Sequence, residues 1–172
     1  MQDFVHLHVH TQYSLLDGQA SVARLVDKAM QNGMKGIAVT DHGNMFGIKE
    51  FTNYVNKKNS GPKGEVKDLK KRIAGIEAGT IECADKEAEI AACKAKIVEA
   101  ENKLFKPVIG CEMYVARRTM DLKEGKPDQS GYHLIVLAKN EKGYHNLIKL
   151  VSHAWTRGYY MRPRTDRREL EK

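Results

Sequence analysis

Apolar and polar positions alternate strictly at the start of the chain, where single aliphatic residues separate His6, His8 and His10. A period of two is typical of a β-strand, so we expect a first strand over residues 4–9 with the three imidazoles on one face. A buried ring nitrogen is unfavourable without a partner, and imidazole is a common ligand of transition metals. The pattern therefore predicts a metal site, and the alternative is a half-exposed strand whose outer face carries histidines.

A helix, a buried strand and a second helix are expected next. Apolar residues spaced three and four apart follow Ser21, which predicts a helix that Ser21 caps and that ends at Asn32-Gly33. Residues 36–40 (GIAVT) form a short apolar run of the kind that is buried on both faces of a parallel sheet. A second helical pattern covers residues 44–57 and begins just after Asp41-His42-Gly43.

Two strands and a helix are expected toward the C-terminus. Residues 107–116, with Glu112 inside them, and residues 132–138 have strand patterns, and residues 143–155 have a helical one. The expected buried positions of this helix are Leu147, Ile148, Leu150, Val151 and Ala154. Strands that alternate with helices favour right-handed βαβ units, so we expect an α/β fold with parallel strands. Sites in such folds lie beyond the carboxyl ends of the strands, which is where His10 and Asp41-His42 fall.

Residues 58–105 interrupt this alternation. They are rich in Lys, Glu and Ala, and an apolar residue or cysteine recurs every seven positions, at Leu69, Ile76, Cys83, Ile90, Ile97 and Leu104. This period is typical of helices that pack on one another. Because the chain must return to the sheet, we expect a helical hairpin that turns near Gly79-Thr80. The hairpin is either a docking arm for a partner or a solvated decoration.

Composition limits the class of protein. The 172 residues, with 41% hydrophobic and 30% charged positions, suit one globular domain or part of a larger one. There is no apolar run of about 20 residues, and the N-terminus has no signal pattern, so we expect no membrane association. The three cysteines have neither metal nor disulfide-framework spacing, which favours a reduced, cytoplasmic protein. The final residues contain no helix-terminating glycine, so we expect the natural chain to continue.

The net charge of +7 permits contact with nucleic acid, although charge alone is weak evidence for it. Much of the positive charge lies in two places, the lysine-rich residues 58–105 and the C-terminal segment MRPRTDRRELEK. A solvated face is the simpler interpretation of the first of these.

Imidazoles and carboxylates lie on or beside the expected strand ends. The candidates are His8, His10, Asp17, His42, Glu112 and His133. Such mixed ligands suit Zn, Mn or Fe, and their number exceeds the four positions of one tetrahedral zinc, which indicates two or three ions. Paired ions can hold both the attacking and the leaving oxygen of a phosphoryl group, so a phosphoester is the expected substrate.

Several other side chains have alternative roles. Asp41 either orients His42 or binds the metal itself. His6 is expected to be a further metal ligand, to donate a hydrogen bond to one of the ligands, or to be a hydrogen-bonded residue at the edge of the strand. His145 and His153 are expected on the surface or in packing, and Cys111 is expected to point away from Glu112 into the core.

Four segments resemble successive blocks of a known family. They are HLHVHTQYSLLDG, GIAVTDHGNMFG, KPVIGCEMYVA and HLIVLAKNEKGYHNLIKLVSHA. They are similar to the N-terminal PHP (polymerase and histidinol phosphatase) domain of the bacterial DNA polymerase III alpha subunits. The resemblance covers nearly the whole chain outside residues 58–105. The phrases SLLDG, IGCEMYVA and LAKNEKGYHNLIKLVS resemble the alpha subunits more than free-standing PHP phosphatases.

The resemblance implies part of a distorted (βα)7 barrel over residues 1–172, interrupted by the helical insertion at 58–105. It also implies two or three divalent ions, of Zn, Mn, Fe or Mg, at the carboxyl ends of the strands. The ligands that it carries over are His8, His10, Asp17, His42, Glu112 and His133. Catalytic roles are expected for Asp17, His42 and Glu112. His133 lies near the start of its strand, so the resemblance alone selects it. The family's late Asp-x-His pair has no counterpart after His133.

The function implied by the resemblance is that of the N-terminal part of a replicative, DNA-directed DNA polymerase. Its PHP module would hydrolyse phosphodiester bonds at a DNA 3′ end, as a proofreading 3′–5′ exonuclease does, or serve as a structural module. DNA and other replisome subunits would be its partners. One alternative is a free-standing PHP phosphoesterase that acts on a small phosphate ester. Another is a non-catalytic scaffold that docks a partner.

Overall fold

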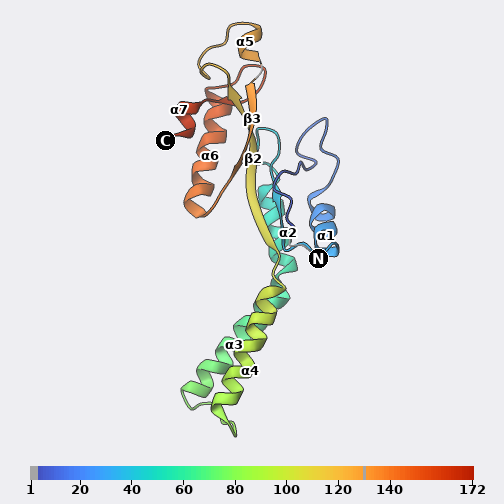
Figure 1. The fold of residues 1–172 in the computed structure, drawn as a ribbon, viewed down its shortest axis with the longest axis vertical. Coiled ribbons are helices and arrows are strands. Elements are labelled where there is room, and N and C mark those ends of the chain that lie inside the picture. Colours follow the sequence, from blue (N-terminus) through green and yellow to red (C-terminus); the bar gives the residue numbers. More distant parts are fainter. Residues whose placement is uncertain (1–3, 130) are drawn as a thin grey trace. The chain divides into compact units, whose positions relative to one another are not determined.

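Residues 4–129 and 131–172 are described by a computed structural model, which shows an α/β fold (Figure 1). Its elements are α1 (Val22–Gln31), β1 (Gly36–Val39), α2 (Ile48–Lys58), α3 (Ser60–Glu77), α4 (Lys86–Asn102), β2 (Lys106–Ala116), α5 (Lys126–Gln129), β3 (Gly131–Leu137), α6 (Glu141–Thr156), β4 (Arg164–Thr165) and α7 (Arg167–Leu170). The chain forms two units, Tyr54–Lys106 on the one hand and the residues before and after it on the other. No helix in the described ranges is long and apolar enough to cross a membrane.

The sheet is built around β2. Strand β2 has β1 on one side and β3 on the other, and β4 also pairs with β2. The β2–β4 pairing is parallel, as is the bridge that joins His42 to Glu112. Strand β3, however, is antiparallel to β2, so the expectation of an all-parallel sheet is wrong for this pair. The connection between them carries only the short helix α5, whereas a parallel return needs a long crossover, usually a helix.

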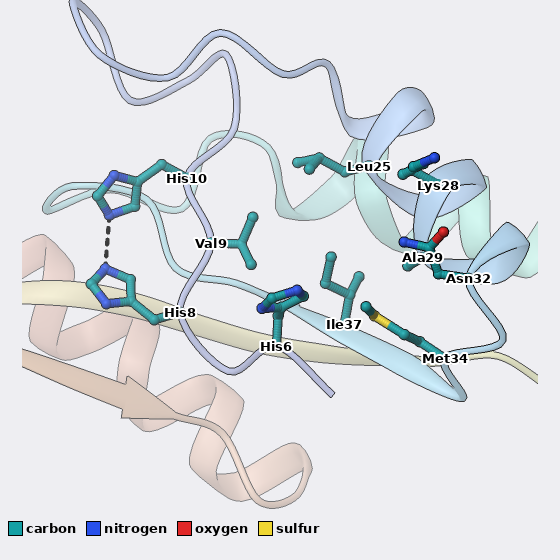
Figure 2. A pocket seen from close by; sticks show the side chains of 10 residues that line it. All are labelled: His6, His8, Val9, His10, Leu25, Lys28, Ala29, Asn32, Met34 and Ile37. Atoms are coloured by element: carbon teal, nitrogen blue, oxygen red, sulfur yellow. Dashed lines mark hydrogen bonds between the residues drawn. The ribbon is translucent and has the colours of Figure 1, made fainter. Parts of the chain in front are cut away.

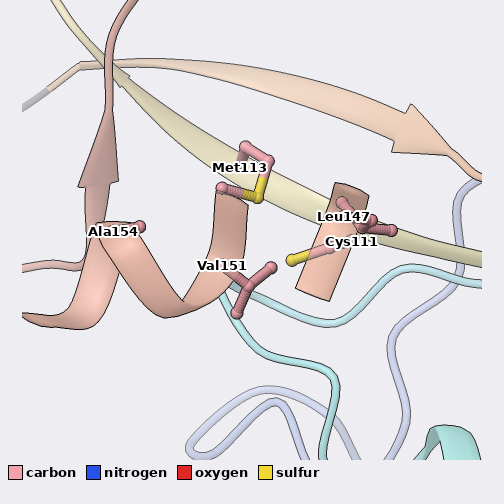
Figure 3. Packing of buried hydrophobic residues seen from close by; sticks show 5 residues of the cluster. All are labelled: Cys111, Met113, Leu147, Val151 and Ala154. Carbon is pink, nitrogen blue, oxygen red and sulfur yellow. The ribbon is translucent and has the colours of Figure 1, made fainter. Parts of the chain in front are cut away.

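The two faces of β2 have different neighbours. Cys111 and Met113 lie on one face and pack against Leu147, Val151 and Ala154 of α6 (Figure 3). The side chain of Glu112 lies on the opposite face, as alternation requires. The prediction that Cys111 belongs to the core is therefore confirmed, and burial raises the pKa of its thiol to about 12.

Helix α6 buries a narrower stripe than its sequence suggested. Leu150 packs only partly against the core cluster, and Ile148, which was expected to be buried, is 37% exposed. Ile148 follows Leu147 directly, so it lies about 100° around the helix from it, toward the edge of the packed face.

The predicted first strand is absent, because residues 4–9 form no regular ladder and the chain bends at Leu7. The Ala38 amide donates to the His6 carbonyl, and the Thr40 amide donates to the Val9 carbonyl, each over 2.9 Å. The Val9 amide, however, donates to the side-chain oxygen of Thr40 instead of to a backbone carbonyl. This side-chain contact interrupts the ladder, so strict alternation does not keep the three histidine rings together.

The first residues of two helices differ from what the sequence pattern predicted. Helix α1 begins after Ser21 as predicted, but the Ser21 side chain makes no capping hydrogen bond. Helix α2 begins at Ile48 instead of residue 44, because Asn44 forms a turn: its amide donates to the carbonyls of Tyr13 and His42. The end of α1 agrees with the prediction, since Gly33 has a φ of +75° there.

The unit Tyr54–Lys106 contains the predicted helical hairpin. Helices α3 and α4 pack along one another, and the chain reverses between them (Figure 1). Gly79 lies in the connection with a φ of +73°, which confirms the predicted turn. Ile76, Cys93 and Ile97 are buried between the helices, and these apolar contacts hold the hairpin together.

A buried asparagine joins the two ends of this unit. The Asn59 amide donates to the Phe105 carbonyl over 2.8 Å, and its oxygen accepts from the Phe105 amide over 2.9 Å. We expect Asn59→Ala to lower the free energy of unfolding by about 2–3 kcal/mol, because both backbone groups then lose their buried partner. Urea unfolding followed by circular dichroism measures this. The exposed Asn56, whose oxygen accepts from Lys63, is the control, and equal losses in the two variants would contradict the prediction.

The basic C-terminal segment is folded into the sheet. Arg164 is 1% exposed and donates to four backbone carbonyls, those of Met120, Leu122, Asp128 and Gly158. Asp166 caps α7 by accepting from the Glu169 amide. The charge of this segment therefore includes at least one cation that is buried and structural.

Candidate metal centre

The site is built on the face of β2 opposite α6, around Glu112. Tyr114 lies two residues further on, so it shares this face. His133 of β3 is the cross-strand partner of Tyr114, and its Nδ1 is hydrogen-bonded to Glu112 Oε1. Because β3 is antiparallel to β2, the start of β3 lies beside the C-terminal half of β2. This direction brings His133 to the site, although it is not at the carboxyl end of its strand.

His42 reaches Glu112 through backbone pairing. The Glu112 amide donates to the Asp41 carbonyl over 3.0 Å, and the Gly43 amide donates to the Glu112 carbonyl over 2.9 Å. These bonds hold the His42 ring where its Nδ1 lies 2.8 Å from Glu112 Oε2. Its Nε2 lies 2.7 Å from Asp17 Oδ2. The ring therefore stands between the two carboxylates.

The extended N-terminal segment supplies two more rings. The Nε2 atom of His10 lies 2.8 Å from Glu112 Oε2 and 2.9 Å from His8 Nε2. The Nε2 atom of His8 lies 3.5 Å from the same carboxylate oxygen. One oxygen of Glu112 thus faces three imidazoles, those of His8, His10 and His42.

Asp41 holds the loop that carries Asp17. Its side chain is 1% exposed and accepts from the Thr11 amide, the Thr11 hydroxyl and the Ser14 hydroxyl over 2.6–2.8 Å. Ser14 in turn accepts from the His42 amide over 3.1 Å. Both oxygens of Asp41 therefore face the loop, which argues against its acting as a direct ligand.

The same loop requires a glycine after Asp17. A Cβ at Gly18 would lie 1.8 Å from the Thr11 carbonyl oxygen, closer than any side chain tolerates. The Gly18 amide donates to the Ser14 carbonyl, which closes the turn. The SLLDG phrase is thus explained by backbone packing that sets the position of Asp17.

Both carboxylates of the site favour the ionised form. Burial opposes ionisation of Glu112, but the hydrogen bond with His133 and the nearby rings of His42 and His10 outweigh it and lower its pKa. The hydrogen bond with His42 lowers the pKa of Asp17. The site therefore presents two anionic carboxylates to the surrounding imidazoles near neutral pH.

The six predicted ligands form three overlapping groups. Within each group the candidate ligand atoms lie within 4.8 Å of one another. The groups are His8–His10–Glu112, His10–Asp17–His42 and His42–Glu112–His133. Atoms that share one tetrahedral zinc at 2.0–2.1 Å lie about 3.4 Å apart, which is close to the separations found here. Their roles as ligands remain a prediction, but the structure brings all six together.

A buried ring nitrogen supports the fit to a metal. Although His42 Nδ1 lies 2.8 Å from Glu112 Oε2, it has no hydrogen-bond partner in the described part of the chain. A buried nitrogen in this state is unfavourable unless its lone pair has another use. Coordination of a cation is such a use, and imidazole with carboxylate is a donor set that divalent transition metals accept.

His6 lies outside the three groups. Its ring packs edge-on against Phe4, and it lines a pocket with Val9, Ile37 and residues of α1 (Figure 2). Figure 2 shows the His8 and His10 rings joined to one another, apart from His6. His145 and His153 of α6 also belong to none of the groups among the described residues, and their partners are Glu141 and Glu169.

Tyr114 belongs to the site, although the sequence analysis did not select it. Its ring is nearly parallel to that of His42, with centroids 6.0 Å apart and an angle of 14°. It meets the His133 ring edge-on at 4.9 Å and accepts a hydrogen bond from Arg162 over 2.8 Å. Its position two residues after Glu112 is the sequence signal that could have identified it.

This α/β fold and its histidine–carboxylate cluster agree with a family-level match. A model described as the PHP domain matches residues 6–172, so the chain belongs to the PHP domain family. The described residues show a four-stranded sheet, and the full seven-stranded barrel remains a prediction.

The relatives are alpha subunits of DNA polymerase III. The chain is 40% identical to that of Borreliella burgdorferi over 98% of its length, and 39% identical to that of Treponema pallidum over 95%. It is 33% identical to that of Aquifex aeolicus over 99% of its length. The chain spans about a tenth of these relatives, namely 11%, 10% and 11% of their respective lengths.

Proposed function

We propose that this chain is the N-terminal PHP portion of a replicative DNA polymerase and that its metal centre hydrolyses phosphodiester bonds at a DNA 3′ end. One observation carries the catalytic part: four imidazoles and two carboxylates from separate segments converge around Glu112. The relatives support the polymerase part, since each is named as DNA polymerase III subunit alpha. In this proposal the parent protein works in the bacterial cytoplasm with DNA and other replisome subunits.

The domain organisation follows from the same proposal. Residues 58–105 are an insertion in the PHP domain, and the structured hairpin lies within a unit of its own. The family match extends across this region. The insertion leaves the ligands His42 and Glu112 on either side of it in the sequence.

The six clustered residues would hold two or three divalent ions, of Zn, Mn, Fe or Mg. Such ions, when bound, make a coordinated water more acidic and neutralise charge on the phosphoryl oxygens. Glu112 has the central role, because its oxygens are hydrogen-bonded to the rings of His10 and His133 and one of them lies 2.8 Å from His42 Nδ1. Asp17 is the exposed carboxylate, and the hydrogen bond with His42 lowers its pKa, so it stays ionised and would be available to bind a cation.

Metal removal tests this proposal. We expect the purified protein to shorten 5′-labelled single-stranded DNA from its 3′ end, to lose this activity after chelation and extensive dialysis, and to regain it when Mn²⁺ or Zn²⁺ is returned. Elemental analysis before and after dialysis gives the metal content per chain. A hydrolysis rate that chelation does not change would refute a metal-dependent site. Metal that binds without any hydrolysis of DNA would instead support the structural alternative.

A further inference from the structure

We infer that Trp155, Tyr159 and Arg162 form a docking site for single-stranded DNA beside the metal centre, where a base stacks on the two aromatic rings and Arg162 binds a backbone phosphate. This inference rests on the proposed function, because it specifies how the substrate of that site is held. Three observations support it: the exposure of the rings, their attachment to the metal centre, and the surroundings of the arginine.

The two rings form an exposed stack. Their centroids are 5.6 Å apart with an angle of 20° between the planes, and Trp155 and Tyr159 are 43% and 48% exposed. Tyr159 lies just beyond the end of α6, and Gly158 sets its position, since a Cβ there would lie 1.9 Å from the Arg164 carbonyl oxygen. A pair of rings held by the backbone and open to solvent is the kind of surface on which single-stranded bases stack.

The stack is attached to the metal centre. The indole N–H of Trp155 donates to the Gly43 carbonyl over 2.7 Å, and Gly43 follows the candidate ligand His42 directly. Gly43 has a φ of +59°, and a Cβ there would lie 2.7 Å from the Pro163 side chain. The loop that presents His42 and the aromatic stack are therefore fixed to one another. A base on the stack would lie close to a phosphodiester at the ligands.

Arg162 supplies a positive charge at the same place. One of its N–H groups donates to the Tyr114 hydroxyl over 2.8 Å, and its guanidinium carbon lies 4.9 Å from the centre of the Tyr114 ring. Within residues 4–129 and 131–172, the contacts of its guanidinium are with Tyr114 and not with a carboxylate. Its remaining N–H groups are free to bind phosphate, for which a guanidinium is well suited.

Single-stranded DNA fits this surface better than a protein partner does. Stacked rings bind the faces of bases, an unpaired guanidinium binds phosphate, and both lie beside a centre that is proposed to cleave phosphodiesters. A small phosphate ester would need the metal centre and Arg162 but would not use the stack. The aromatic pair therefore distinguishes a nucleic-acid substrate from a small ester.

Intrinsic fluorescence tests the inference directly, since Trp155 is the single tryptophan of the chain. We would titrate the metal-free 172-residue protein with oligothymidylate and with an abasic oligonucleotide of equal length. We expect oligothymidylate to quench the emission and the abasic strand to have little effect. Tyr159→Leu should weaken binding about tenfold, and Tyr159→Phe should retain it. Arg162→Gln should reduce the slope of the logarithm of the binding constant against the logarithm of the salt concentration by about 1.

Tyr144→Leu is the matched control, because Tyr144 lies on α6 about 16 Å along the helix from Trp155. Circular dichroism verifies that each variant is folded. Unchanged emission with every oligonucleotide, or equal quenching by the abasic strand, would overturn the inference. Equal binding by Tyr159→Leu and the unaltered protein would also overturn it. Because the titration uses metal-free protein, its failure is distinguishable from a failure of metal-dependent hydrolysis.

Discussion

Replacing Glu112 with glutamine is expected to abolish the metal centre while leaving the fold in place. The carboxylate is 3% exposed and faces His8, His10, His42 and His133, so it is the one residue that all four imidazoles share. Glutamine has nearly the same size but no negative charge, and its amide group directs protons toward the rings. Removal of residues that merely support a metal ligand lowers affinity or activity by about 10–100-fold, so we expect a larger loss here, more than about 100-fold.

The measurement combines metal content per chain with the rate of 3′-end hydrolysis under saturating metal. His153→Gln is the matched control, because His153 also contacts a carboxylate, that of Glu169, but lies outside the cluster. We expect the control to keep both its metal and its rate. If Glu112→Gln retained both as well, the proposed centre would be wrong.

Replacing Arg164 with methionine is expected to have the largest effect on stability. The buried guanidinium satisfies the carbonyls of Met120, Leu122, Asp128 and Gly158, and methionine fills similar volume without any donor. A buried carbonyl without a partner costs about 1–3 kcal/mol. Some of the four will reach water, so we expect the free energy of unfolding to fall by about 3–5 kcal/mol.

Urea unfolding, with the midpoint and slope fitted together, measures this loss. Arg164→Lys should recover only part of the stability, because an ammonium keeps the charge but has no planar fork of donors. Arg167→Met is the control: Arg167 is exposed and, among the described residues, pairs with Glu171 across one helical turn, so no measurable change in the unfolding midpoint is expected. Equal losses at the two positions would show that the Arg164 hydrogen bonds contribute little.

The local pattern of apolar and polar residues was sufficient to predict most of the helices and strands. The apolar run at 36–40, the strand around Glu112 and the spacing of α6 each depend on neighbouring residues, and the structure has these elements within a few residues of the predicted bounds. The same logic selected Glu112, because a carboxylate inside an apolar strand needs a partner. His42 was selected because it follows a buried strand.

The direction of β3 could not be obtained in this way. Alternation identifies a strand but does not say which way it runs beside its neighbour, and the assumption of a parallel sheet placed His133 at the wrong end. Only the family resemblance retained it. The first strand failed for a related reason, since the Thr40 hydroxyl takes the bond that a ladder needs, and nothing near residue 9 indicates this.

The role of Arg164 was missed and that of Asp41 was left open, because both depend on residues that are distant in the sequence. In the sequence, Arg164 cannot be told apart from the exposed arginines of MRPRTDRRELEK. Only the structure shows that backbone carbonyls of residues 120–128 surround it. Asp41 stands next to His42, so it was considered a possible ligand, yet its carboxylate binds Thr11 and Ser14. Contacts between residues far apart in the sequence decide both cases.

The hydrogen bonds between Asn59 and Phe105 have a consequence for how the chain can fold. Pairing His42 with Glu112 closes a loop of about 70 residues, and the entropy lost on closure grows with the number of flexible residues enclosed. Once α3 and α4 have packed together, Asn59 and Phe105 are held side by side, so the loop that the His42–Glu112 pairing closes shrinks from about 70 residues to about 24. The hairpin could then lengthen or shorten by matched helical turns with little kinetic penalty to sheet assembly.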